Sequence, residues 1–287
     1  MYQFKRSTDL KKHLDLVRKS NKSIGFVPTM GALHNGHLSL IQAAKEKTDV
    51  VVCSIFVNPT QFNDPKDFEK YPITVEDDIK KLNSVSTDIL FLPSVEEMYP
   101  EGLESDLHYD FGNLETILEG KFRPGHFQGV GRIVHKLLDI VQPNQLFMGQ
   151  KDLQQCLIVR RLLAITHSPV KLVVCPTERE KDGLAMSSRN ARLSPAARKK
   201  APAIYQALLE IKNNFGKGLH FLEGAHEAFD ALKKQGFEPE YVDILQLDDD
   251  MLHPLDQPPG NATVVVALAA WLDGVRLIDN LILQGNL

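Results

Sequence analysis

Residues 23–47, SIGFVPTMGALHNGHLSLIQAAKEK, indicate most clearly which class of fold this chain adopts. Its first six residues predict a buried strand, and the spacing of apolar residues predicts a helix from about residue 36 to residue 47. The turn between them contains Gly31 and Gly36, together with His34 and His37. A strand that leads directly into a helix is the repeating unit of an α/β protein.

Strand patterns recur along the first 176 residues. They lie at residues 49–57, 87–93, 144–149 and 170–176. Helical patterns separate them at residues 74–83, 129–142 and 153–166. Because parallel strands need a crossover connection, this alternation predicts a Rossmann-like parallel sheet with helices on both faces.

The pattern changes after Pro176. Two helical patterns come first, at residues 195–213 and 221–235. Three strand patterns follow, at residues 240–247, 262–272 and 275–283. Helices followed by a run of strands are typical of an α+β domain. We therefore expect an α/β protein of two domains, a Rossmann-like domain over residues 1–175 and a smaller α+β domain over residues 176–287.

Composition narrows the class of protein. The 287 residues carry a net charge of −4, which argues against a broad nucleic-acid surface. No apolar stretch is long enough to span a membrane, and residues 1–20 predict an amphipathic helix instead of a signal peptide. Each cysteine lies in an apolar run, which favours buried reduced thiols over disulfides or a zinc site. We expect a cytoplasmic protein that binds neither nucleic acid nor membrane.

The turn in the opening stretch is the first candidate site. It follows a strand, so it lies at the carboxyl edge of the sheet, where α/β proteins bind ligands. The helix N-terminus suits phosphate, and His34 and His37 add hydrogen-bond donors. The stretch is neither a P-loop nor G-x-G-x-x-G. A metal site at the two histidines, or a helix start with two incidental histidines, are the alternatives.

Two further segments carry polar side chains beside this turn. In FVNPTQF, Asn58 and Gln61 are neutral amides suited to the hydroxyl and carboxylate groups of a small substrate. The segment EGKFRPGHFQGVG, residues 119–131, predicts a loop that covers a site. Its cationic or titratable side chains are Lys121, Arg123 and His126. A Pro-centred turn and a solvated basic loop are the alternatives.

The last two segments also suit phosphate. FMGQKDLQQ, residues 147–155, follows a strand and offers a mobile cation, Lys151, and a carboxylate, Asp152. DGLAMSSRN, residues 182–190, offers two serine hydroxyls and a guanidinium, those of Ser187, Ser188 and Arg189. An N-capped helix and a polar inter-domain loop are the alternatives. Together the segments hold many phosphate-binding groups and no general-base carboxylate pair, which favours nucleotidyl transfer.

These motifs resemble a known family. MGALHNGH is similar to the HxGH signature of nucleotidyltransferases related to class I aminoacyl-tRNA synthetases. Its combination with FVNPTQF, RPGHFQGV, FMGQKDLQQ, DGLAMSSRN and the tail AAWLDGVRLIDN resembles the pantoate–β-alanine ligases over essentially the whole chain. The resemblance implies that ATP and pantoate give pantoyl adenylate and pyrophosphate, and that β-alanine then attacks to give pantothenate and AMP. It also implies Mg²⁺ with ATP, no tightly bound organic cofactor, and a homodimer in the cytoplasm.

The resemblance also assigns roles to residues. His37, His34 and Lys151 match the catalytic positions. The ATP-binding positions match Met30, Gly31, Ala32, Leu33, His34, Asn35, Gly36, His37, Gly149, Gln150, Lys151, Asp152, Glu178, Met186, Ser187, Ser188 and Arg189. The pantoate and β-alanine positions match Gln61, Asn58 and Gln155. The metal ligands stay unknown, with Asp152 as a candidate beside the ATP phosphates.

Two residues depart from the family pattern, and two other functions stay open. Met148 replaces a small residue, and Glu178 replaces an apolar one at a position that meets adenine through its backbone. A different adenylyltransferase, acting on a nucleotide or on phosphopantetheine, is one alternative. An ATP-binding sensor without turnover is the other. For the dimer, a contact through the strand at residues 49–57 is a hypothesis.

Overall fold

The computed structural model describes residues 1–63, 68–69, 71–104, 106–216, 221–255 and 259–287. The chain forms two compact units. The first contains Met1–Gly149 and Gln154–Cys175, and the second contains Gln150–Leu153 and Pro176–Leu287. The short segment Gln150–Leu153 therefore belongs to the same unit as the C-terminal part of the chain.

The first unit is built on a parallel sheet of six strands, in the order β1-β4-β3-β2-β5-β6. The strands are β1 (Tyr2–Phe4), β2 (Ile24–Thr29), β3 (Val50–Ile55), β4 (Ile89–Phe91), β5 (Gln145–Gly149) and β6 (Lys171–Cys175). The five predicted strands are confirmed. The edge strand β1 was missed because only three residues form it, directly before the predicted N-terminal helix.

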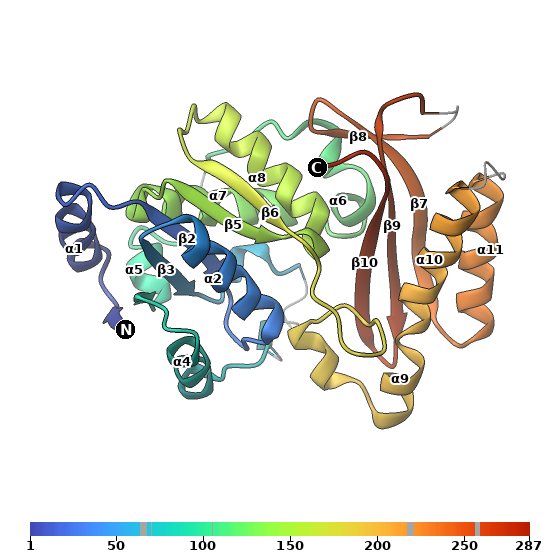
Figure 1. Cartoon of the computed structure of the whole chain (residues 1–287), viewed down its shortest axis with the longest axis horizontal. Coiled ribbons are helices and arrows are strands. Elements are labelled where there is room, and N and C mark those ends of the chain that lie inside the picture. The colour runs from blue at the N-terminus through green and yellow to red at the C-terminus, as the bar shows by residue number, and fades with distance from the viewer. Residues whose placement is uncertain (64–67, 70, 105, 217–220, 256–258) are drawn as a thin grey trace. The chain divides into compact units, whose positions relative to one another are not determined.

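Helices lie on both faces of this sheet, as the alternating pattern predicted (Figure 1). They are α1 (Ser7–Lys19), α2 (Asn35–Lys47), α4 (Val75–Ser84), α5 (Val95–Met98), α6 (Leu118–Phe122), α7 (His126–Val141) and α8 (Leu153–Ile165). Short 3₁₀ turns η1 (Pro59–Gln61), η2 (Gly112–Glu115) and η3 (Gln150–Asp152) connect some of them. Because both faces are covered, every residue of β3 is buried.

The strand order places a switch point beside β2. From β2 the chain runs outward to β3 and β4, and it then crosses back to β5 on the other side of β2. Ligands of open α/β sheets bind outside the carboxyl ends of the strands at such a point. The HxGH turn follows β2, so the fold places it at the position where a ligand site is expected.

Two expectations about this unit are wrong. Residues 119–131 do not form a covering loop, because α6 ends at Phe122 and α7 begins at His126, which leaves three residues between the helices. The strand at residues 49–57 cannot offer an edge for a dimer, because β3 lies between β2 and β4 and is hydrogen-bonded to both.

The second unit packs helices on an antiparallel sheet. Its strands β7 (Glu238–Asp248), β8 (Met251–Pro254), β9 (Thr263–Leu272) and β10 (Val275–Gln284) lie in the order β10-β9-β7-β8. The predicted first helical pattern divides into α9 (Pro195–Lys200) and α10 (Ala203–Gly216), since Pro202 has no N–H for the helical ladder. The remaining helix is α11 (Phe221–Lys234), and the turn η4 spans Ser188–Arg192.

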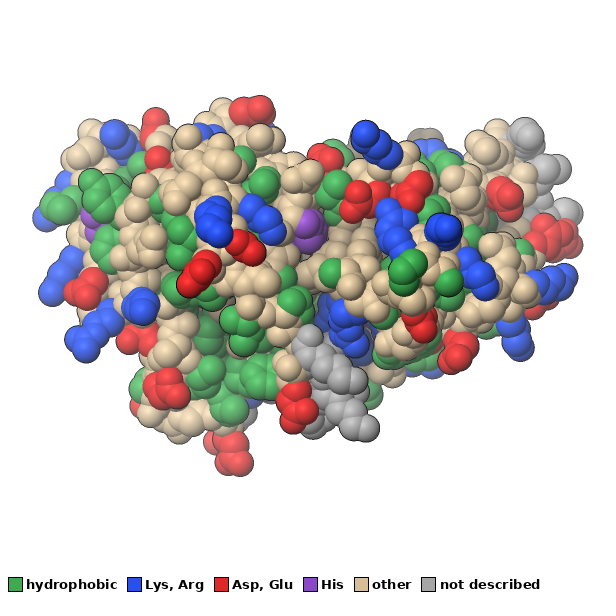
Figure 2. All heavy atoms as spheres, turned by 90° about the horizontal axis from the view of Figure 1, so that it is seen from below, with side chains coloured by type: hydrophobic (Ala, Val, Ile, Leu, Met, Phe, Trp, Pro, Cys, Tyr) green, Lys and Arg blue, Asp and Glu red, His purple; other side chains and the backbone are tan. Residues whose placement is uncertain are grey.

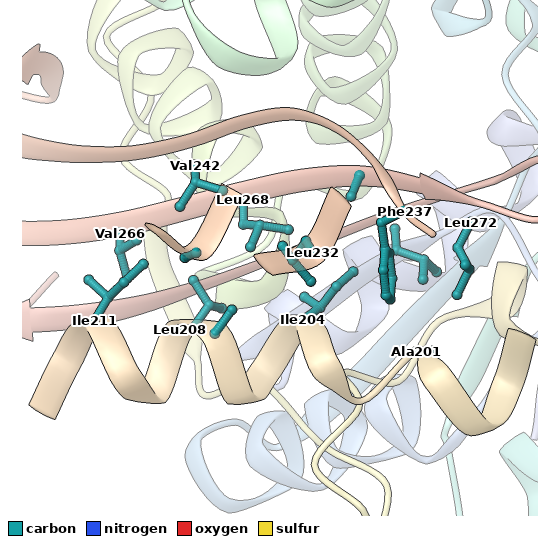
Figure 3. Packing of buried hydrophobic residues seen from close by; sticks show 14 of the residues in the cluster. Ala201, Ile204, Leu208, Ile211, Leu232, Phe237, Val242, Val266, Leu268 and Leu272 are labelled. Atoms are coloured by element: carbon teal, nitrogen blue, oxygen red, sulfur yellow. The ribbon is translucent and has the colours of Figure 1, made fainter. Parts of the chain in front are cut away.

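The core of this unit follows from helical and strand spacing. In α10, Ile204, Leu208 and Ile211 recur at intervals of three and four and face the sheet, as Figure 3 shows. From β9, Val266 and Leu268 meet them, at the interval of two that places strand side chains on one face.

The surface shows mixed charge. On the face drawn in Figure 2, Lys and Arg side chains alternate with Asp and Glu side chains and do not gather in one continuous patch. None of the described helices combines the length and the apolar composition needed to cross a bilayer.

Candidate active site

The turn after β2 adopts a left-handed backbone at two successive residues. Gly31 has φ of +83° and Ala32 has φ of +49°. Glycine tolerates this region, whereas alanine is strained there. A Cβ on Gly31 would lie 3.0 Å from the Ile55 side chain and 3.2 Å from the Asp78 carboxylate. The turn is therefore left-handed and closely packed, and both properties favour glycine at position 31.

Two charged side chains of α4 hold this turn. The fully buried Asp78 carboxylate accepts the backbone N–H of Ala32 at 2.9 Å and that of Leu33 at 2.7 Å. Lys81 Nζ donates to the Leu33 carbonyl at 2.7 Å. The sequence predicted only a charged helix here, because nothing local indicates that its side chains meet a turn more than forty residues earlier.

His34 and His37 form a reciprocal cap at the start of α2. His34 is the N-cap residue, and its Nδ1 accepts the Gly36 N–H at 3.2 Å. His37 Nδ1 accepts the His34 N–H at 3.3 Å. A neutral ring that accepts at Nδ1 carries its hydrogen on Nε2. The cap thus selects the tautomer that offers an Nε2–H donor. Asn35, the first residue of α2, is exposed.

The amides predicted beside this turn form a buried network in the first unit. Asn58 is 1% exposed, and its Oδ1 accepts the hydroxyl groups of Tyr99 at 2.7 Å and Thr60 at 3.1 Å. Its Nδ2 donates to Gln61 Oε1 at 3.1 Å and to the Gly129 carbonyl at 3.2 Å. Gln61 Nε2 lies 3.1 Å from Met30 Sδ, in the turn after β2. The network orients Gln61 with its amide nitrogen toward that turn.

Helix α7 packs against η1 and contacts the backbone of Gln61. A Cβ on Gly129 would lie 2.3 Å from the Thr60 carbonyl oxygen, so only glycine allows η1 to approach the helix this closely. His126 is 5% exposed, and its Nδ1 lies 2.7 Å from the Gln61 carbonyl oxygen. Arg123 Nη1 lies 3.1 Å from His126 Nε2. Arg123 and His126, which the sequence placed on a loop, instead hold the backbone of Gln61. The exposed Lys121 lies over the ring of Phe122.

The Gln pair at the start of α8 divides into two roles. Gln154 is 4% exposed, and its amide is bonded to backbone groups of Leu114, Ile117 and Glu119. Gln155 is partly exposed. Of the two, only Gln155 is therefore accessible. A Cβ added to Gly149, the last residue of β5, would meet no heavy atom within 4 Å, so the space beside this glycine is open.

In the second unit, η3 carries the predicted cation. Lys151 Nζ lies 3.4 Å from Asp152 Oδ1, and Asp152 is about half exposed. The backbone of η3 is held by Asn280, whose Nδ2 donates to the carbonyls of Gln150 and Lys151, both at 2.9 Å. Asn280 in β10 was not predicted as a site residue, since it is about 130 residues away in the chain.

The serine segment follows a small hairpin. Met186 N–H donates to the Glu178 carbonyl at 2.9 Å, and Glu178 has an exposed side chain. Ser187 caps η4 and accepts the Arg189 N–H at 3.3 Å. Within the hairpin, Arg179 pairs with the buried Asp279 carboxylate at 2.5 and 2.9 Å. Ser188 is partly buried in η4.

Comparison with known proteins identifies relatives. The pantoate–β-alanine ligase family model matches residues 3–282. A pantothenate synthetase of Cytophaga hutchinsonii is 44% identical over 276 residues, which are 96% of each chain. The crystal structure of a pantothenate synthetase from Thermus thermophilus has a TM-score of 0.90 at 41% identity, covering 99% of this chain and 100% of that one. A Francisella tularensis pantoate–β-alanine ligase, complexed with beta-gamma ATP and β-alanine, has a TM-score of 0.81 at 37% identity, covering 100% and 99%.

A parallel sheet with a His-x-Gly-His turn after its switch-point strand defines an α/β nucleotidyltransferase. The match extends over nearly the full chain and includes the second unit. The chain belongs to the pantoate–β-alanine ligase family.

Proposed function

We propose that this protein joins pantoate to β-alanine at the expense of ATP, giving pantothenate, AMP and pyrophosphate through a pantoyl-adenylate intermediate. The observation that carries the proposal is the family match over residues 3–282. The chemistry requires activation, because a carboxylate is a poor electrophile. Transfer of AMP to the pantoate carboxylate supplies a leaving group that the amine of β-alanine displaces.

The first step needs positive charge and donors around phosphate. Attack of pantoate on the α-phosphorus of ATP builds negative charge there and on pyrophosphate. His34 and His37 offer Nε2–H donors, Lys151 offers an ammonium group, and Ser187–Arg189 offer hydroxyl and guanidinium groups. The remaining ATP contacts are proposed on the resemblance alone: Met30, Gly31, Ala32, Leu33, Asn35, Gly36, Gly149, Gln150, Asp152, Glu178 and Met186.

The acceptor side uses amides. Gln61, with its amide nitrogen directed toward the turn after β2, donates to an oxygen of pantoate, and Gln155 supplies a second amide. Asn58 already uses both amide hydrogens and accepts two hydroxyl groups. It therefore acts on the substrate by orienting Gln61. Neutral amides suit a hydroxy acid better than a phosphorylated acceptor, which disfavours the alternative adenylyltransferases.

Magnesium fits this site as a companion of ATP. No group of three His, Cys, Asp or Glu side chains suited to a metal occurs among the described residues. Mg²⁺ typically binds through one or two carboxylates, substrate phosphates and waters, so a dedicated protein cage is not needed. Asp152, which is about half exposed, is the candidate protein ligand. Bound there, Mg²⁺ would neutralise phosphate charge.

The assembly and compartment complete the proposal. A homodimer rests on the family resemblance, and light scattering tests it directly. A reducing, cytoplasmic location is supported by the three cysteines, which are all buried and free.

The decisive experiment measures pyrophosphate release from ATP and Mg²⁺, with and without pantoate. Release that needs pantoate, followed by AMP and pantothenate formation that needs β-alanine, supports both steps. Release that needs a different acceptor would replace the substrate assignment and keep the nucleotidyltransferase class. ATP binding without any pyrophosphate release would support a sensor.

A further inference from the structure

Strand β10 carries a buried amide in its centre. Asn280 is 3% exposed and pairs in register with Ala267 of β9. A buried amide is costly unless its groups are hydrogen-bonded, so its partners indicate what it does. Here the partners lie in η3, the turn that carries Lys151.

The amide makes three bonds to two successive residues. Nδ2 donates to the carbonyl oxygens of Gln150 and Lys151, both at 2.9 Å, and Oδ1 accepts Gln150 Nε2 at 3.2 Å. The two N–H groups of this amide thus bind two consecutive backbone carbonyls. One carbonyl precedes the Lys151 Cα and the other follows it, so the backbone is restrained on both sides of that atom. The direction in which the lysine side chain leaves the backbone is thereby fixed.

We propose that Asn280 is a positioning residue for Lys151. Through this contact, β10 fixes the backbone of η3, so that the Lys151 ammonium group lies where it can stabilise charge on the phosphates of ATP. The inference rests on the proposed function, in which Lys151 stabilises charge on phosphate. Misplacement of a catalytic group by about 1 Å costs on the order of 10²-fold in rate. Lys151 has a flexible four-carbon side chain, so the backbone restraint is what limits its reach.

A second contact, independent of Asn280, joins β10 to the hairpin that precedes Ser187. The neighbouring Asp279 forms the two-bond pair with Arg179, whose guanidinium carbon lies 3.8 Å from the centre of the Tyr205 ring. Arg179 and Ala185 form the bridge of the hairpin that precedes Ser187. Adjacent residues of β10 thus anchor two segments that the proposed function assigns to ATP.

A double-mutant cycle separates positioning from a general structural role. The four proteins are the unmodified chain, Asn280→Ala, Lys151→Ala and the double variant, each assayed by pantoate-dependent pyrophosphate release. We expect Asn280→Ala to lower kcat by about tenfold or more, and Lys151→Ala by about 10²-fold. In the Lys151→Ala background, Asn280→Ala should change kcat by less than about twofold, since no ammonium is left to position.

The control lies on the same strand. Arg276 pairs with Glu240, with its Nε 2.8 Å from Oε2, and both side chains are largely buried. Arg276→Met should lower the melting temperature and leave kcat unchanged. If Asn280→Ala does not fold, Asn280→Leu keeps a similar size, removes the two donors without burying a charge, and enters the same cycle.

The outcomes are distinct. An equal loss on mutating Asn280 in both backgrounds would show a general structural role and overturn the inference. A Lys151→Ala variant with unchanged kcat would instead remove the proposed function of Lys151, and the inference with it. That failure is visible in the single variant before the cycle is complete.

Discussion

His34 and His37 stand at the first turn of α2 with their ring centroids 4.1 Å apart, and each ring accepts a backbone N–H through Nδ1. The pair therefore caps the N-terminus of α2, and the same two hydrogen bonds fix the tautomer of each ring. Capping and phosphate binding use different ring nitrogens, so substitutions can separate the two roles.

Replacing His34 by Asn should keep the cap and lose the Nε2–H donor. Asn is among the best N-cap residues, so the free energy of unfolding should change by less than about 0.5 kcal/mol. We expect kcat to fall by roughly 10²-fold, with a smaller change in the KM for ATP. Chemical denaturation and steady-state kinetics measure the two effects. His167→Asn, at an exposed residue with φ of +49°, is the control, and it should change neither quantity. An unchanged kcat for His34→Asn would refute the role of the donor.

Replacing Tyr99 by Phe should loosen the amide network. Its hydroxyl donates to Asn58 Oδ1 at 2.7 Å, and burial raises the pKa of Tyr99, so the group stays protonated and donating at neutral pH. We expect a loss of about 1 kcal/mol in stability and a several-fold higher KM for pantoate. Kinetics at varied pantoate concentration test this.

Tyr109 provides a matched control for that substitution. It is similarly buried, its hydroxyl lies 2.6 Å from His135 Nδ1, and burial raises its pKa to about 12. Tyr109→Phe should lower stability by a comparable amount and leave the KM for pantoate unchanged. Equal effects of the two variants on that KM would argue against a specific role for Tyr99.

Gly129→Ala should push η1 away from α7. The added Cβ would lie 2.3 Å from the Thr60 carbonyl oxygen, where backbone has to move. Overpacking of this kind costs about 1–3 kcal/mol, and the displaced Gln61 should also raise the KM for pantoate. Gly216→Ala is the control, because no heavy atom lies within 4 Å of a Cβ there. A Gly129→Ala protein with unaltered melting temperature and KM would show that the contact is not restrictive.

Asp78→Asn should weaken the turn after β2. The substitution puts an amide nitrogen or a neutral oxygen against two backbone N–H groups and should cost about 2 kcal/mol or more of stability. The neighbouring Asp77 is exposed and pairs only with Lys80 among its described contacts, at 2.9 Å, so Asp77→Asn should leave the stability almost unchanged. Urea denaturation of both variants measures their free energies of unfolding. Similar losses in the two variants would contradict the role of Asp78 in holding the turn.

The thiols should resist labelling in the folded protein. Burial raises the pKa of Cys53 to about 12 and also raises that of Cys175. Because only the thiolate reacts, the reactive fraction of Cys53 at pH 8 is on the order of 10⁻⁴. A thiol-specific reagent should label no cysteine rapidly at pH 8 and all three in denaturant. Fast labelling of one thiol in the native protein would show that its site opens.

The local elements, and the turn that joins β2 to α2, follow from the pattern of residues along the chain. Periodicity predicted the strands β2 to β6 and the helices α2 and α8, because a segment buried on one or both faces must repeat apolar residues at the interval of its own geometry. The candidate donors of the HxGH turn could also be named from the sequence, since they lie within four residues of one another.

Which distant groups hold those turns depends on how the elements pack together in the folded chain. Asp78 meets Ala32, Tyr99 meets Asn58, and Asn280 meets Lys151 across intervals of 46, 41 and 129 residues. His126 was expected in a loop because Pro124 and Gly125 suggested one, yet it begins a buried helix against η1. Hydrophobic periodicity records whether a residue is buried and on which face of its own element. It does not record the partner of a buried polar group, because that partner is chosen by how separate elements pack.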